Sequence, residues 1–170
     1  MSMPLFVVGG SSVAVLASLV LGWPGTASGV DVFHCSPSQP NSHPGDLPSS
    51  AARFNYGNKL LRVELPAGGH LIAGRLPNGG VMALVNPDGS ISAKVGWWRG
   101  LPARLVISGH RLDKKAGPLR ADVPPSNSYG VPGLIPSGLT FPTTGCWRVT
   151  ATLGRAHLRF VLFVTRRNVG

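Results

Sequence analysis

Acidic side chains are the scarcest chemical group in this chain of 170 residues, which holds only six of them. They are Asp31, Asp46, Glu64, Asp88, Asp113 and Asp122. Glycoside hydrolysis needs two carboxyl groups placed across a cleft. The first two acids lie near the N-terminus and the fourth precedes a glycine in a turn pattern, so only Glu64 with Asp113 or Asp122 remains as a pair. That pairing is conceivable, but nothing in the sequence supports it.

The chain also lacks the motifs that carry most enzyme and metal chemistry. It contains no Gly-x-Ser-x-Gly turn, no Cys–His pattern of a known protease type and no phosphate-binding glycine loop. A zinc site needs three or four converging ligands, and no two of the five histidines are two to four residues apart. Ser108 and His110 share one side of an expected strand, but no acid is placed to orient the histidine. We expect a protein without enzymatic activity, metal or cofactor.

Charge is absent from the apolar stretch between Leu5 and Gly22. A helix-breaking Trp-Pro-Gly sequence follows, and then small residues up to Gly29. This order is typical of a secretory signal peptide, here residues 1–29, although no Lys or Arg precedes the apolar stretch. The alternative is an uncleaved anchor, because the stretch approaches the length that spans a membrane. Either form predicts a secreted or cell-surface protein, with any membrane contact made by an uncleaved N-terminal segment.

Cysteine is rare as well, with Cys35 and Cys146 as the only two. Two cysteines in an exported protein favour one disulfide. The bond would close a loop of 111 positions, and the chain-entropy description assigns about 4–5 kcal/mol to a loop of that length. Two unpaired thiols are the alternative.

Basic residues are plentiful where acids are scarce. The chain has 16 Lys and Arg, twelve of them Arg, and a formal net charge of +10. A basic exported domain is attracted to anionic polymers such as teichoic acids, lipid head groups or nucleic acid. No run of bases exceeds two, and the aromatic residues do not alternate with the bases, which argues against a base-stacking surface for nucleic acid. A solvated basic surface without a dedicated ligand is the plainer alternative.

Turn-forming residues divide the remainder into an arm and a domain. Residues 30–53 hold four prolines among Ser, Asn and Gly and read as an extended arm, whereas residues 54–166 alternate apolar and polar positions. Residues 167–170 form a tail. Strands are expected near 61–65, 70–75, 81–85, 91–97, 105–112 and 119–123, with a long Pro/Gly-rich connection from Asp113 to Ser137. About seven to nine short strands predict an all-β antiparallel sandwich.

The final strands carry the strongest pattern. With Gly154 and Arg155 as a two-residue turn, glycine occupies the position where a II′ turn needs positive φ. This register pairs Val149 with Phe160 on an apolar face and places Cys146 on the opposite face. That opposite face is polar near the turn and apolar near the cysteine, so we expect the arm around Cys35 to cover it.

These strands also suggest a family. The pieces YGNKLLRVEL, DGSISAKVGWWRG, LVISGHRLD and PSGLTFPTTGCWRVTATLGRAHLRFVLFV resemble small exported bacterial immunoglobulin-like domains, over about residues 55–165. The positions that fit are Gly145, Trp147, Val149, Leu158, Phe160 and Val161. The resemblance implies an immunoglobulin-like sandwich and an extracytoplasmic location, without a catalytic set. In antibody-type domains the second cysteine faces the core, whereas Cys146 does not, so a disulfide here should attach the arm to the outside.

Four residues are candidates for a binding surface: Trp98, Arg99, Arg111 and Tyr129. Strand alternation sends Trp97 and Trp98 to opposite faces, so Trp98 is either exposed beside Arg99 or covered by a loop. Long loops on rigid scaffolds often bind ligands, which makes Tyr129 a further candidate. We therefore expect an exported, basic, non-enzymatic module that binds a cell-surface partner, an anionic polymer or another protein, or has a structural role there. A hydrolase assembled from scattered His, Asp and Ser residues and a nucleic-acid binder are the alternatives.

Overall fold

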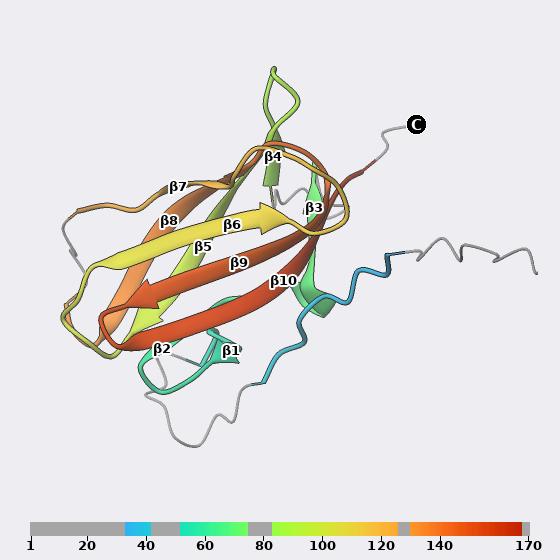
Figure 1. Ribbon diagram of the computed structural model, residues 1–170. Coiled ribbons are helices and arrows are strands. Elements are labelled where there is room, and N and C mark those ends of the chain that lie inside the picture. Colours follow the sequence, from blue (N-terminus) through green and yellow to red (C-terminus); the bar gives the residue numbers. More distant parts are fainter. Residues whose placement is uncertain (1–32, 42–51, 75–82, 126–129, 168–170) are drawn as a thin grey trace, which may run out of the picture. The chain divides into compact units, whose positions relative to one another are not determined.

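The computed structural model describes residues 33–41, 52–74, 83–125 and 130–167 (Figure 1). The predicted signal peptide and Tyr129 lie outside these residues. The described chain is all-β, as the alternation predicted. Its elements are β1 (Tyr56–Gly57), β2 (Leu61–Val63), the short 3-10 turn η3 (Ala67–Gly69), β3 (His70–Ala73), β4 (Ala83–Val85), β5 (Ile91–Arg99), β6 (Leu105–Arg111), β7 (Arg120–Asp122), β8 (Gly133–Phe141), β9 (Gly145–Leu153) and β10 (Ala156–Arg166). Within the described ranges, no helix has the length and apolarity that crossing a membrane would require.

All ten strands belong to one open, mixed sheet. Its path runs β1-β2-β5-β4-β3-β10-β9-β6, and β8 joins β5 to β7. One edge of β5 pairs with β8 along its whole length, and the other edge is shared between β4 and β2. The prediction of a purely antiparallel sheet is wrong, because β3 runs parallel to both β10 and β4. The turn at η3 brings the chain from the edge of β5 to the edge of β10, and β3 arrives there in the direction of β10.

The β9–β10 hairpin has the register that the sequence predicts. Val149 lies opposite Phe160, and Cys146 lies opposite Phe163. Gly154 has a φ of 56°, as the first central position of a II′ turn requires. Val149 and Phe160 are buried, so this face of the hairpin belongs to the core.

Strand β8 is longer than the sequence predicted. The first half of β8 was expected to belong to the Pro/Gly-rich connection that ends at Ser137. Proline and glycine, here Pro136 and Gly133, are uncommon inside strands, so the sequence did not predict a strand there. Strand β5 pairs with all nine positions of β8, whereas β7 pairs only with Gly138 to Thr140. Among the described residues, Pro136 therefore has a partner strand on one side only, and a strand tolerates the missing N–H group on the other side.

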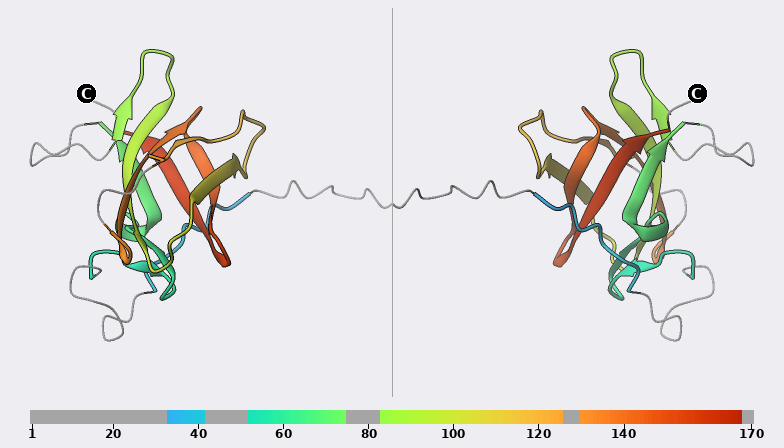
Figure 2. Two further views of the ribbon diagram at one scale, coloured as in Figure 1. Left: turned by 90° about the vertical axis from the view of Figure 1, so that its left-hand side faces the viewer. Right: turned by 90° about the vertical axis from the view of Figure 1, so that its right-hand side faces the viewer.

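The core lies between the β5–β8 pair and the β9–β10 pair, which can be followed from two sides in Figure 2. Trp97 of β5 meets Phe160 of β10 with ring centroids 5.9 Å apart. Phe141 of β8 meets Trp147 of β9 at 5.5 Å, edge to face. Neither pair belongs to hydrogen-bonded neighbouring strands, so these rings hold two parts of the sheet against each other across the core.

The N-terminal arm is fastened to the outer side of the hairpin, where it runs in blue beside β10 in Figure 1. The predicted disulfide between Cys35 and Cys146 is present. Ser38 pairs with Val161 twice, through its backbone N–H to the carbonyl oxygen and through its Oγ from the Val161 N–H, both at 2.9 Å. Cys146 points away from the core face that carries Val149, so the bond attaches the arm to the outside, as expected.

Candidate functional site

Of the four residues predicted to bind a partner, the three that the structure describes, Trp98, Arg99 and Arg111, do not form one surface. Trp98 is only 6% exposed and packs against Phe54 and Leu134. The exposed alternative for Trp98 is therefore wrong, since both neighbouring tryptophans are buried and Phe54 covers the second one. Arg99 and Arg111 line two separate cavities.

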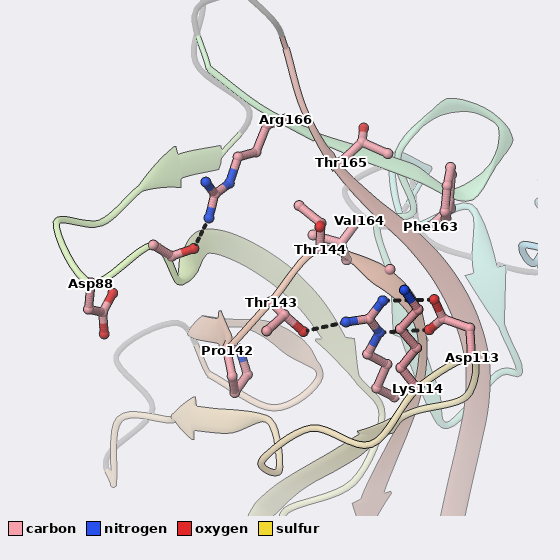
Figure 3. Close-up of a pocket in the computed structure, with 13 residues that line it drawn as sticks. Asp88, Asp113, Lys114, Pro142, Thr143, Thr144, Phe163, Val164, Thr165 and Arg166 are labelled. Carbon is pink, nitrogen blue, oxygen red and sulfur yellow. Dashed lines mark hydrogen bonds and ion pairs between the residues drawn. The ribbon is translucent and has the colours of Figure 1, made fainter.

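Arg111 lies in the larger cavity, of about 810 Å³, between the turn at residues 88–89, the loop at 142–145 and the end of β10 (Figure 3). Its guanidinium donates two hydrogen bonds to the Asp113 carboxylate, from Nε at 2.7 Å and from Nη2 at 2.8 Å. Nη1 donates a third hydrogen bond to Thr143 Oγ1 at 3.0 Å. The pKa of Asp113 falls to about 2, mainly because Arg111 donates to the carboxylate and also because the Cys146 N–H does. The pKa of Arg111 is raised, mainly because its guanidinium donates hydrogen bonds to Asp113. Arg111 thus stabilises the fold at this end of the sheet.

Gly145 allows this arrangement. Its φ is +133°, and a Cβ atom there would lie 2.6 Å from Arg111 Cζ. The other bases of the cavity are Lys114 and Arg166, and Arg166 donates to the carbonyl of Gly89. Two acidic and three basic side chains line this cavity, so it is not marked as a site for a charged ligand of one sign.

A different surface gathers positive charge without negative charge. It is the outward side of β6, β9 and β10, which we call the basic face. Its members are Val106, Ser108, His110, Arg148, Thr150, Thr152, His157, Arg159 and Val161. Strand register places them in three rows, which are His110–Arg148–Val161, Ser108–Thr150–Arg159 and Val106–Thr152–His157. Strand spacing gives this grid a size of about 10 Å by 13 Å.

No carboxylate of the described residues belongs to the basic face. Glu64 lies after β2, Asp88 in the turn before β5, Asp113 on Arg111, and Asp122 on β7. The arm from Phe33 to Asn41 adds no acid beside it. Two guanidinium groups, two imidazoles and three hydroxyls are thus presented together on one face.

The basic face was not predicted from the sequence, although the sequence did predict the pairing of two of its three strands. The hairpin register already places Thr150 opposite Arg159 and Thr152 opposite His157. The third column comes from β6, whose pairing with β9 joins segments distant in the chain. Across the part of the chain that the structure describes, no three His, Cys, Asp or Glu side chains gather as metal ligands would.

Comparison with known proteins identifies no relative from which a function could be inferred. No protein-family model matches the chain, and neither a curated protein nor a solved structure matches it significantly.

Proposed function

We propose that the chain is an exported, non-enzymatic immunoglobulin-like β-sandwich that binds an anionic polymer at the cell surface through the basic face. The observation that carries this proposal is the grid of bases and hydroxyls on β6, β9 and β10 without a carboxylate among the described residues. Arginine forks suit phosphate and carboxylate groups, and hydroxyls add further hydrogen bonds. Because no acid of the described residues forms an ion pair with Arg148 or Arg159, both are offered to an external anion.

Strand pairing supports the immunoglobulin-like part of the proposal. The group β2–β5–β8–β7 faces the group β6–β9–β10–β3 across the aromatic core. Two such packed groups with mainly antiparallel pairing are the architecture of that sandwich. The Cys35–Cys146 disulfide points to an oxidising, extracytoplasmic environment, where anionic surface polymers are found.

The test is cosedimentation of the folded protein with purified cell walls and with vesicles containing anionic lipid, at low and moderate salt. The double variant R148S/R159S should bind vesicles roughly 10- to 30-fold more weakly, at about 1 kcal/mol for each base near an anionic surface. The matched control K114S/K115S removes the same charge from the exposed segment after β6 and should bind almost as the unchanged protein does. No sedimentation at either salt concentration would refute the proposal, since screening weakens but does not abolish contacts at low salt.

Two competing functions give distinct outcomes in this experiment. A single-stranded oligonucleotide that displaces the protein from cell walls at equal phosphate concentration would favour nucleic acid as the ligand. Ser108 and His110 lie on the basic face and are the candidate pair of the hydrolase alternative. Release of soluble fragments from the walls, lost in the variant H110A, would favour that alternative.

A further inference from the structure

We propose that the cavity around Arg99 is a second binding site, which takes a carboxylate attached to a small apolar group. The cavity has a volume of about 530 Å³ and lies where β5 ends and β6 begins. Its position is separate from the basic face, because its floor is the end of the core and not the outer side of the sheet. It therefore adds a small-molecule site to the polymer binding proposed above.

Arg99 occupies a position at which an apolar residue is expected. Strand alternation places it on the same side of β5 as Trp97, which is completely buried in the core. Leu61 and Gly133 lie beside it on the two neighbouring strands. The guanidinium is thus directed between the two parts of the sheet at the open end of the core.

The hydrogen bonds of Arg99 leave this guanidinium poorly satisfied. Nη1 donates to the carbonyl of Ala103 at 3.4 Å and Nη2 to that of Gly130 at 3.3 Å, both long for such bonds. Nε is buried and has no partner among the described residues. No carboxylate in the same residues forms an ion pair with Arg99. A charged group held partly out of water without strong acceptors is costly, and an anion in the cavity would offer Nη1 and Nη2 a closer acceptor than the two carbonyls.

The walls of the cavity define the rest of the ligand. Leu105 and Ile135 form a floor that is continuous with the core, and both are buried. Three prolines, Pro102, Pro124 and Pro125, line the cavity around them. The exposed Arg104 stands at the rim as a second base. The size is in the range of small-molecule sites, and apolar surface with few polar groups is their usual composition.

These features together favour a carboxylate over a phosphate. A carboxylate presents two oxygens to a guanidinium and carries a single charge, which the one partly buried Arg99 can balance. The apolar group joined to the carboxylate would cover the Leu105 and Ile135 floor, which a free phosphate would leave hydrated. The C-terminus of a peptide and a short fatty acid share this chemistry.

The test is titration of the whole protein, followed by calorimetry and by amide NMR shifts. The probes are N-acetyl-leucine, octanoate, N-acetyl-leucine methylamide and inorganic phosphate. We expect N-acetyl-leucine or octanoate to bind with shifts at Leu105 and Ile135, and the neutral methylamide to bind at least roughly ten-fold more weakly. The stronger of the two acids distinguishes a peptide C-terminus from an acyl chain. Equal binding of acid and amide, or binding of phosphate alone, would overturn the proposal.

Two variants assign the binding to this cavity. R99M should weaken carboxylate binding at least roughly ten-fold, whereas R155M, in the exposed hairpin turn, should not change it. Should R99M unfold, the rim variant R104E serves in its place, and its unchanged affinity would count against the site. Cosedimentation of R99M with cell walls should remain as in the unchanged protein. Loss of carboxylate binding with intact sedimentation thus separates this site from the polymer-binding face.

Discussion

Replacement of Asp113 by Asn should remove a definite share of the stability of the fold. The carboxylate accepts two hydrogen bonds from Arg111, at 2.7 and 2.8 Å, and one from the Cys146 N–H at 3.1 Å. Its side chain is 23% exposed and that of Arg111 is 13% exposed, so solvent screens the pair only in part. The variant D113N keeps the shape of the side chain but loses its charge, and Arg111 then lacks its counterion.

The magnitude follows from the pKa of Asp113. The value of about 2 in the folded protein lies below the ordinary 3.8, so the folded state prefers the ionised carboxylate. Each pKa unit corresponds to about 1.4 kcal/mol, which gives about 2 kcal/mol. This stability is fully present above pH 4 and is lost as the pH falls from about 4 to about 2. At pH 7 the free energy of unfolding of D113N should be lower by at least about 2 kcal/mol, since Arg111 is also left without its counterion.

Urea unfolding between pH 2 and pH 7, followed by tryptophan fluorescence, measures this effect. The pKa of Asp88 is also lowered, mainly by the Ser90 hydroxyl, so the wild-type curve alone mixes two carboxylates. The difference between wild type and D113N isolates Asp113 and should shrink as the pH falls from 4 to 2. The matched control D122N, at an exposed position on β7, should leave the curve unchanged. A difference between wild type and D113N below 0.5 kcal/mol at pH 7, or one that stays constant with pH, would refute the reasoning.

Two further changes test the fastening of the hairpin. The double variant C35S/C146S should lower the free energy of unfolding by up to about 4–5 kcal/mol. Reductant should lower the free energy of unfolding of the unchanged protein by the same amount. An effect of reductant on the double variant would show that reductant acts through something other than this disulfide. G145A should lower the melting temperature, because its Cβ would collide with Arg111 at a φ of +133°, at a cost of about 1–3 kcal/mol. G138A is the matched control, since a Cβ there meets nothing closer than 3.7 Å; equal effects of both glycine variants would contradict this explanation.

Local signals were sufficient for the hairpin and insufficient for the sheet. Gly154 and the alternating residues around it determine register within a short segment, and that register is correct. The first half of β8 was not predicted, because proline, here Pro136, has a low intrinsic preference for strands. The pairing of β8 with β5 outweighs this preference, and only the folded chain reveals that pairing. The parallel position of β3 beside β10 likewise depends on segments far apart in sequence.

At the candidate site, too, features set by neighbouring residues were predictable, and features set by distant segments were not. Alternation correctly placed Trp97 and Trp98 on opposite faces, but the cover over Trp98 is Phe54, which arrives from another part of the chain. The disulfide was predictable because an exported chain with only two cysteines favours one bond between them. The basic face was only half visible, because its third column depends on the pairing of β6 with β9. The unsatisfied Nε of Arg99 depends on side-chain packing that no pattern of residue types encodes.

The Cys35–Cys146 bond also decides how the domain responds to mechanical load. Tension applied between residues 33 and 167 passes through the disulfide and enters β9 directly, bypassing the 111-position loop that holds β1 to β8. The shortest covalent path then contains about 25 residues, which extend to roughly 90 Å, against roughly 470 Å for the reduced chain. The oxidised domain is therefore a short, stiff link under tension, and most of its strands cannot be pulled out while the bond is intact.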